Sequence, residues 1–183
     1  MMPTETEIIA ITKRWIERFV IQHQICPFAR RVFEADRIRY QVILATEVEP
    51  LLMDLQSAFH LLDQQPEVAT SFLIFPQQFS EFLAYLDFAD LAQAFLVQQD
   101  YEGIYQLATF HPEYQFATAP ANDPAHFTNR SPYAMLHLLR EESIEKALLS
   151  YPDPETIPEK NIAFTRAQGW AKMQSLRDQC WKK

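Results

Sequence analysis

The sequence predicts one α/β domain over residues 1–183, in which helices surround a small, mostly parallel sheet of three or four strands; an α+β arrangement also fits. The 183 residues suit a single domain with one substantial core. Hydrophobic residues make up 48% of the chain and aromatic residues 13%, which is typical of a globular protein. Short apolar runs of strand length alternate with longer amphipathic segments, and this alternation favours a layered α/β domain.

Hydrophobic periodicity locates the expected elements in order along the chain. Helices are expected over residues 4–24, 49–64, 79–99, 131–150 and 158–180. Strands are expected over residues 37–45, 69–75 and 104–110, and a further short strand could form near 114–117. The strand at 69–75 is apolar on both faces, which predicts a central position in the sheet. The helix at 79–99 is apolar on all sides, so we expect it to be buried from more than one side.

The charge of the chain excludes several classes of protein. Lys and Arg number 16 and Asp and Glu number 24, so the net charge is −8. An acidic chain is a poor candidate for binding nucleic acid or a membrane surface, because phosphate neutralisation dominates such affinities. No apolar run approaches the roughly 20 residues of a membrane-spanning helix. The N-terminal sequence lacks the layout of a signal peptide, so we expect a cytoplasmic protein.

Cysteine and glycine content narrow the possible chemistry further. The two cysteines, Cys26 and Cys180, lie far apart and outside any CxxC motif, which excludes a disulfide framework and a four-thiolate zinc site. The only glycines are Gly103 and Gly169, whereas a Rossmann fingerprint or a Walker loop needs several glycines close together. The sequence therefore indicates no particular cofactor.

Residues 110–142 form the most informative stretch of the chain. The stretch begins where a strand should end and continues into a predicted helix, with little periodicity between. A compact domain rarely carries so long an irregular segment unless it is functional or disordered. Disordered segments are poor in aromatic residues, and this one contains Phe110, Tyr114, Phe116, Phe127 and Tyr133. We therefore expect an ordered functional loop that leads into a capped helix.

His111 stands at the start of this loop. In open α/β sheets, ligands bind beyond the carboxyl ends of the strands. If the predicted strands are parallel, their ends near Glu47, Pro76 and His111 share one edge of the sheet. His111 is therefore a candidate general acid or base, and the alternative is a histidine packed in a turn before proline.

The run Asn129-Arg130-Ser131-Pro132 predicts an anion site. Ser131 is expected to cap the helix, with Pro132 in its first turn. The start of a helix carries unpaired N–H groups and positive partial charge, and Arg130 adds a planar bidentate donor beside Asn129. The alternative is that Ser131 only caps the helix and that Arg130 pairs with an acid such as Asp123.

Further candidates lie one turn later and at the end of the first predicted helix. His137 and Glu141 are four residues apart and would share a helix face, so Glu141 could orient the imidazole of a general base. Arg140 lies beside them as a second donor for an anion. The alternative is a surface pair next to a core stripe. Cys26 lies close to two arginines and is either a reactive thiol or a buried structural residue.

Several stretches of the chain resemble one known family. They are 15–20 with Cys26-Pro27-Phe28-Ala29, 105–112, 128–133, 136–141, and Ile157-Pro158-Glu159 with Asn161-Ile162. These stretches resemble the bacterial family catalogued as domain of unknown function 1415, and the resemblance covers nearly the whole chain. The resemblance supports a site within residues 110–142 without supplying a reaction. Ala134 stands where proline is expected in many members of the family, which would change the start of the predicted helix.

Three functions fit these observations. The first is binding or conversion of a small anionic metabolite, held by Arg130 and Ser131, with His111 or His137 as the acid or base. The second is a non-catalytic ligand-sensing or protein-docking module that uses the loop aromatics as anchors. The third is a metal-dependent site that uses His111, His137 and Cys26, although no pair of ligands has a dedicated spacing.

Overall fold

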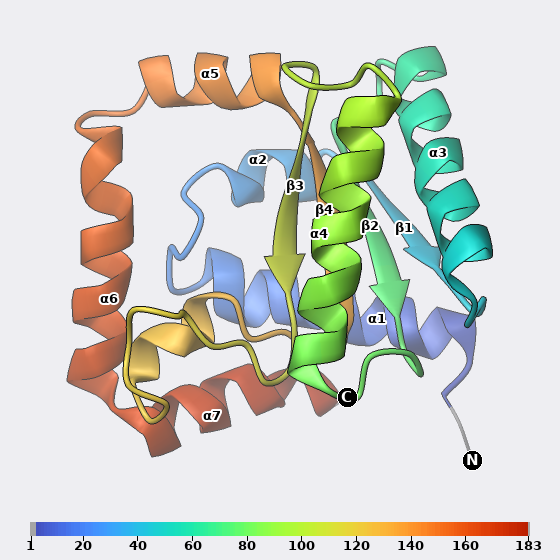
Figure 1. Ribbon diagram of the computed structural model, residues 1–183. Helices are drawn as coiled ribbons and strands as arrows, with labels where there is room; N and C mark the ends of the chain where they lie inside the picture. Colours follow the sequence, from blue (N-terminus) through green and yellow to red (C-terminus); the bar gives the residue numbers. More distant parts are fainter. Residues whose placement is uncertain (1–2, 183) are drawn as a thin grey trace.

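The computed structural model describes residues 3–182 as a central sheet with helices on both faces (Figure 1). The four strands lie in the order β1-β2-β4-β3. Their bounds are β1 (Ile38–Val42), β2 (Thr70–Phe75), β3 (Tyr105–Phe110) and β4 (Ala134–Arg140). The expected α/β fold is therefore confirmed.

The sheet is mixed and not mostly parallel. β1 pairs with β2 in parallel, whereas β4 lies antiparallel between β2 and β3. β1, β2 and β3 consequently run in the same direction, so their carboxyl ends share one edge of the sheet, as the sequence predicted.

Helices cover each face of the sheet. α3 (Val48–Gln64) and α4 (Phe82–Gln98) pack on one face. α1 (Glu5–Trp15), its π-helical continuation η1 (Ile16–Ile21) and α7 (Trp170–Asp178) pack on the other. Neighbouring side chains of β2 alternate between these two cores, as strand geometry requires: Phe72 and Ile74 face α1, whereas Leu73 and Phe75 face α3 and α4.

The remaining elements are short or peripheral. They are α2 (Ala29–Glu34), α5 (Glu141–Leu149), α6 (Ile157–Gln168) and the 3-10 turns η2 (Pro124–Thr128), η3 (Pro154–Thr156) and η4 (Gln179–Trp181). After β4 the chain forms α5, α6 and α7 in succession, and these three helices frame one side of the molecule (Figure 1). The expected helix at 158–180 is in fact two helices, because Gly169 adopts a positive φ of 77° that ends α6.

Two expectations about the apolar elements had different outcomes. β2 is buried along its whole length, which confirms its central position. α4 is buried on one side only, through residues such as Tyr85 and Phe88. Leu83 on its outer side is 74% exposed, so the expectation of burial from more than one side was wrong. α4 belongs to an outer layer of the molecule, and its outward side is exposed.

The largest error concerns the expected helix at 131–150. Residues Ala134–Arg140 form strand β4, and the helix α5 begins only at Glu141. Periodicity alone does not distinguish a short buried strand from a buried helix. In the fold, this segment pairs with β2 on one side and with β3 on the other, which satisfies the backbone hydrogen bonds of both neighbours. The short strand considered near 114–117 is absent from the described residues.

Candidate functional site

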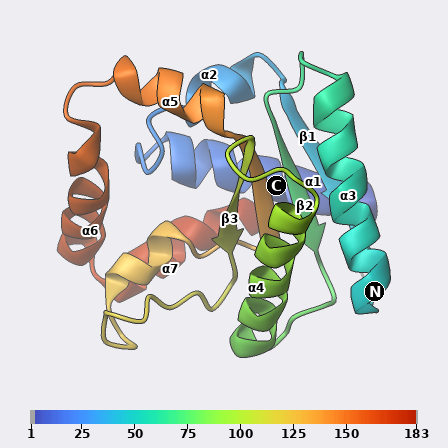
Figure 2. The same ribbon diagram turned by 45° about the horizontal axis from the view of Figure 1, so that its top comes forward.

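The long loop leaves β3 and returns to β4 at the edge where β1, β2 and β3 end. Its two limbs are joined at the base, because the His111 N–H donates to the Asn129 carbonyl (3.2 Å) and the Ser131 N–H donates to the His111 carbonyl (3.4 Å). The Asn129 side chain donates to the Thr109 carbonyl at 3.0 Å. The 3-10 turn η2 within the loop packs against α6 and α7 (Figure 2). These contacts explain why the loop is ordered.

Ser131 does not cap a helix, which corrects the predicted role of this residue. Its backbone precedes strand β4, and its buried hydroxyl donates to the Tyr133 carbonyl. The anion site predicted at this position therefore loses the helix N-terminus that was expected to contribute to it.

His111 is buried, and protein groups occupy both of its ring nitrogens. Nδ1 accepts a hydrogen bond from the Glu113 N–H (3.0 Å), and Nε2 lies 2.8 Å from the Phe79 carbonyl. A backbone N–H can only donate and a carbonyl can only accept, so the ring is the neutral Nε2–H tautomer. Burial is the main factor that lowers the pKa of His111. The imidazole therefore joins the start of the loop to the connection between β2 and α4.

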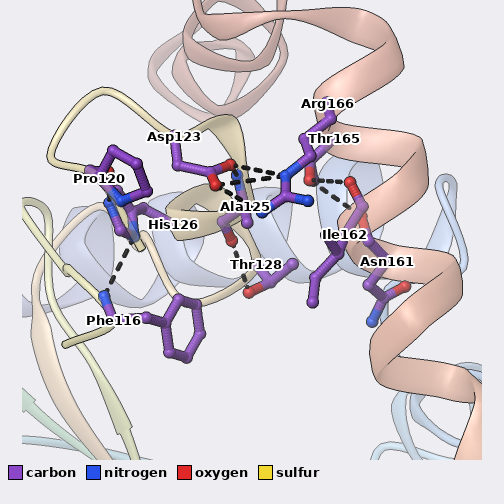
Figure 3. A network of polar contacts seen from close by, with 10 residues as sticks. All are labelled: Phe116, Pro120, Asp123, Ala125, His126, Thr128, Asn161, Ile162, Thr165 and Arg166. Carbon is purple, nitrogen blue, oxygen red and sulfur yellow. Dashed lines mark hydrogen bonds and ion pairs between the residues drawn. The ribbon is translucent and has the colours of Figure 1, made fainter. Parts of the chain in front are cut away.

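His126 joins two parts of the loop in the same way. It is fully buried, its Nδ1 accepts from the Phe116 N–H (3.1 Å), and its Nε2 donates to the Pro120 carbonyl (2.8 Å), as Figure 3 shows. The ring thus closes the tip of the loop around residues 116–126.

Asp123 joins the loop to α6. Its buried carboxylate accepts from Arg166 Nη2 (2.7 Å) and from the Ala125 N–H (2.9 Å), and Figure 3 shows both contacts. The hydrogen bond from Arg166 is the main cause that lowers the pKa of Asp123 to about 2. Asp123 is thus the partner of Arg166, and not of Arg130 as one sequence alternative suggested.

Arg130 is a buried site candidate whose guanidinium makes no ion pair within residues 3–182. The residue is 8% exposed, and its Nε donates to the Tyr114 carbonyl at 3.1 Å. The guanidinium carbon lies 4.6 Å from the ring centre of Trp170 and 5.2 Å from that of Phe127. These contacts fix the plane of the guanidinium, whereas its two terminal nitrogens make no hydrogen bond to a described residue.

Arg177 brings a second guanidinium to the same aromatic ring. Its guanidinium carbon lies 5.7 Å from the ring centre of Phe127, and its Nη1 donates to the Pro112 carbonyl at 3.1 Å. The carboxylate of Asp178 pairs with it at 2.7 Å. Burial and then the nearby Arg177 lower the pKa of Arg130. We call Arg130, Arg177, Phe127 and Trp170 the Arg130 face.

Arg177 and Trp170 were not identified from the sequence as residues of the site. The available signal was their spacing of seven residues, which places both on one side of a helix. Nothing in that spacing indicates that α7 packs against η2, which is what brings these side chains to Arg130.

His137 lies in β4, and so it does not share a helix face with Glu141 as predicted. Its ring stacks on Phe72 with the centroids 3.9 Å apart, and its Nε2 lies 2.6 Å from the Thr70 hydroxyl. That hydroxyl donates its hydrogen to the Leu138 carbonyl, so His137 Nε2 is the donor in the contact with Thr70. Burial lowers the pKa of His137 to about 3.

Arg140 and Glu141 lie at the far end of β4 from Arg130. Arg140 donates to the carbonyls of Leu62 (2.6 Å) and Val68 (3.0 Å), and so it caps the C-terminal end of α3. Glu141 is the first residue of α5, where a carboxylate is favourable to the helix dipole. The structure therefore does not bring either residue to the Arg130 face.

Cys26 lies in the turn after η1 and is partly buried. Burial raises the pKa of its thiol, so the thiolate form is disfavoured. Arg30, one of the two nearby arginines, pairs with Glu34 at 3.3 Å. Within residues 3–182 no three His, Cys, Asp or Glu side chains are placed to hold a metal ion, so the cluster considered from His111, His137 and Cys26 is not assembled.

The predicted aromatic anchors of the loop are mostly not at the surface. Phe127 and Tyr133 belong to the core on the α1 side of the sheet. Tyr114 and Phe116 are half-buried and pack edge to face with the centroids 5.1 Å apart. These four residues therefore stabilise the loop, and they do not form one exposed apolar patch.

Comparisons with known proteins agree with the resemblance noted in the sequence. The sequence model of the family described as "Protein of unknown function (DUF1415)" matches residues 7–175. No curated protein and no solved structure matches the chain. Among residues 3–182, no helix has both the length and the apolarity needed to cross a membrane. The family match covers nearly the whole chain, and the chain therefore belongs to the DUF1415 family.

Proposed function

We propose that this protein binds a small anionic molecule at the Arg130 face. The observation that carries the proposal is the convergence of Arg130 and Arg177 on the ring of Phe127, with the terminal nitrogens of Arg130 unpaired among the described residues. Buried charges in proteins are usually paired, because removing a charge from water is costly. An anion bound to the terminal nitrogens of Arg130 would supply the missing partner.

The electrostatics of the face favour an anion over a neutral ligand. Two like charges lie within reach of one another, and burial strengthens their repulsion. Among residues 3–182, the one carboxylate that pairs closely here, Asp178, is bound to Arg177. Glu113 raises the pKa of Arg130, but its side chain is exposed to solvent. A carboxylate or phosphate oxygen would accept from the planar fork of Arg130, whose orientation the Trp170 and Phe127 rings hold in advance.

His111 acts in this proposal as a positioning residue for the Arg130 face. Its ring holds the turn 111–113, and the next residue, Tyr114, supplies the carbonyl that accepts from Arg130 Nε. Its ring nitrogens are both engaged, so a proton transfer by His111 would first require one of these hydrogen bonds to break. The geometry accordingly supports a binding role more directly than a catalytic one.

The proposal is tested by calorimetric titration of the protein with inorganic phosphate and, separately, with succinate. We expect saturable binding of at least one anion, and we expect Arg130→Ala to weaken it more than about tenfold, as loss of charge-assisted hydrogen bonds does. Arg130→Lys keeps the charge and loses the fork, so its effect should be smaller.

The matched control is Arg39→Ala, which removes one positive charge from an exposed position on β1. Binding by this variant should equal that of the wild type. Unchanged affinity in a folded Arg130→Ala variant, or an equal loss in Arg39→Ala, would refute an anion site at the Arg130 face.

A further inference from the structure

A recess lies between the turn that follows η1 and helix α6. It has a volume of about 160 Å³. His23, Gln24 and Pro27 form one wall, and residues of α6 form the other. Asn161 of α6 donates from Nδ2 to the Ile25 carbonyl at 2.7 Å, and this hydrogen bond holds the two walls together. The adjacent η1 segment is a π-helix, a form often found at functional sites.

Aromatic rings provide the apolar part of the recess. His23 stacks on Phe164 with the centroids 5.5 Å apart and an interplanar angle of 24°. Tyr151 lines the recess from the connection between α5 and α6, and its ring packs edge to face on Phe28 at 5.5 Å. These contacts fix the orientation of the His23 and Tyr151 rings, so a flat apolar surface exists before any ligand binds.

The polar groups of the recess are positively charged or unpaired. Lys160 lies 5.9 Å from the ring centre of Tyr151 and makes no ion pair within residues 3–182. Lys172 lies within electrostatic reach of His23. Several polar atoms of the recess have no hydrogen-bond partner among the described residues. They are the two ring nitrogens of His23, the Tyr151 hydroxyl and Oδ1 of Asn161. Burial, together with Lys172, lowers the pKa of His23, which keeps the imidazole neutral.

The size of the recess limits what it accepts. A cavity of about 150 Å³ holds one benzene ring, whereas pockets for larger ligands span roughly 300–1,000 Å³. A volume of about 160 Å³ therefore matches a single ring and is too small to enclose a nucleotide.

We propose that this recess binds a small planar aromatic carboxylate, with its ring against His23 and Phe164 and its carboxylate toward Lys160. The ring would cover the flat face of the stacked pair, where an aromatic ligand gains packing beyond the area that it buries. The carboxylate would accept hydrogen bonds from Lys160 and from the Tyr151 hydroxyl. This site is independent of the Arg130 face, because the two share no residue.

The test follows the imidazole resonances of His23 by NMR while benzoate is titrated into the protein, with His23→Gln used to assign them. We expect saturable shifts at His23 with benzoate and markedly weaker shifts with benzylamine, whose charge is reversed. Lys160→Gln should weaken benzoate binding by roughly two- to fivefold, the range expected for an exposed charge pair. Tyr151→Ala removes one wall from a half-buried position and should weaken binding as well.

Two further variants separate this site from others. Lys146→Gln removes a lysine of α5 that pairs with Glu142, and it should leave the benzoate affinity unchanged. Arg130→Ala should also leave the His23 shifts unchanged, so failure of the Arg130 face and failure of this site are distinguishable. An absence of His23 shifts in the folded wild type, equal binding of benzylamine, or an unchanged affinity in Lys160→Gln would each overturn the proposal.

Discussion

Replacement of His137 by phenylalanine should reduce the sensitivity of the protein to mild acid. The imidazole stacks on Phe72 and donates to Thr70, and both contacts are made by the neutral ring. Burial holds the pKa of His137 in the folded protein at about 3, compared with an ordinary value of 6.5. The unfolded chain therefore binds a proton near pH 6 that the folded protein does not bind.

The magnitude follows from the linkage between protonation and folding. A group whose pKa is lower in the folded state contributes its full stability above the pKa of the unfolded state, and that contribution falls as the pH decreases toward the folded pKa. Between pH 7 and pH 5, a histidine with an unfolded pKa of about 6.5 loses about 2 kcal/mol. At pH 5 a folded pKa of about 3 leaves the ring almost entirely neutral, so this figure is insensitive to the exact folded value.

The assay is urea unfolding of the wild type and of His137→Phe at pH 7 and pH 5, monitored by tryptophan fluorescence. The phenylalanine keeps the stack on Phe72 and loses one hydrogen bond, while the Thr70 hydroxyl still donates to the Leu138 carbonyl. We expect the variant to be less stable by about 1 kcal/mol at pH 7. Its loss of stability from pH 7 to pH 5 should be about 2 kcal/mol smaller than that of the wild type.

The other titrating groups, including His111, are present in both proteins and cancel in this comparison. An equal loss of stability in the two proteins between pH 7 and pH 5 would refute the conclusion that His137 is held neutral in the fold. A folded state that titrates near pH 6.5 at this residue, measured by NMR, would refute it directly.

Three further predictions concern the contacts that hold the loop and the sheet in place. Asp123→Asn should destabilise the protein by about 1–2 kcal/mol, because it removes the charge that accepts from Arg166, and limited proteolysis should then cleave the loop near residues 116–125 faster. Because the folded pKa of Asp123 is lowered to about 2, its contribution is complete above about pH 5 and is lost as the pH falls toward about 1. Acid unfolding of Asp123→Asn should therefore depend less steeply on pH in that window, and an identical profile would contradict the pairing. Arg140→Leu should lower the free energy of unfolding in urea by about 2–3 kcal/mol, because it leaves the carbonyls at the end of α3 without their donor. The control Arg39→Ala should change that free energy by less than about 0.5 kcal/mol, and equal effects of the two variants would show that the cap is unimportant.

Much of the fold can be predicted from local sequence patterns. The three parallel strands and the helices between them follow from periodicity, because each buries one side or both sides of a regular element. The ordered conformation of the 110–142 loop likewise follows from its aromatic content. Phe127 and Tyr133 are buried in the core, and their burial holds the loop in place. The location of Arg130 in that loop is a property of the sequence as well.

The tertiary structure alone determined the rest. Residues Ala134–Arg140 form a strand and not a helix because β2 and β3 offer unpaired backbone on both sides, which no local pattern shows. That change places His137 on Phe72 and Arg140 on α3, far from the roles predicted for them. Arg177 and Trp170 reach Arg130 because α7 packs under the loop. Periodicity records which side of an element is buried, whereas the partners that meet there depend on how segments distant in the chain pack together.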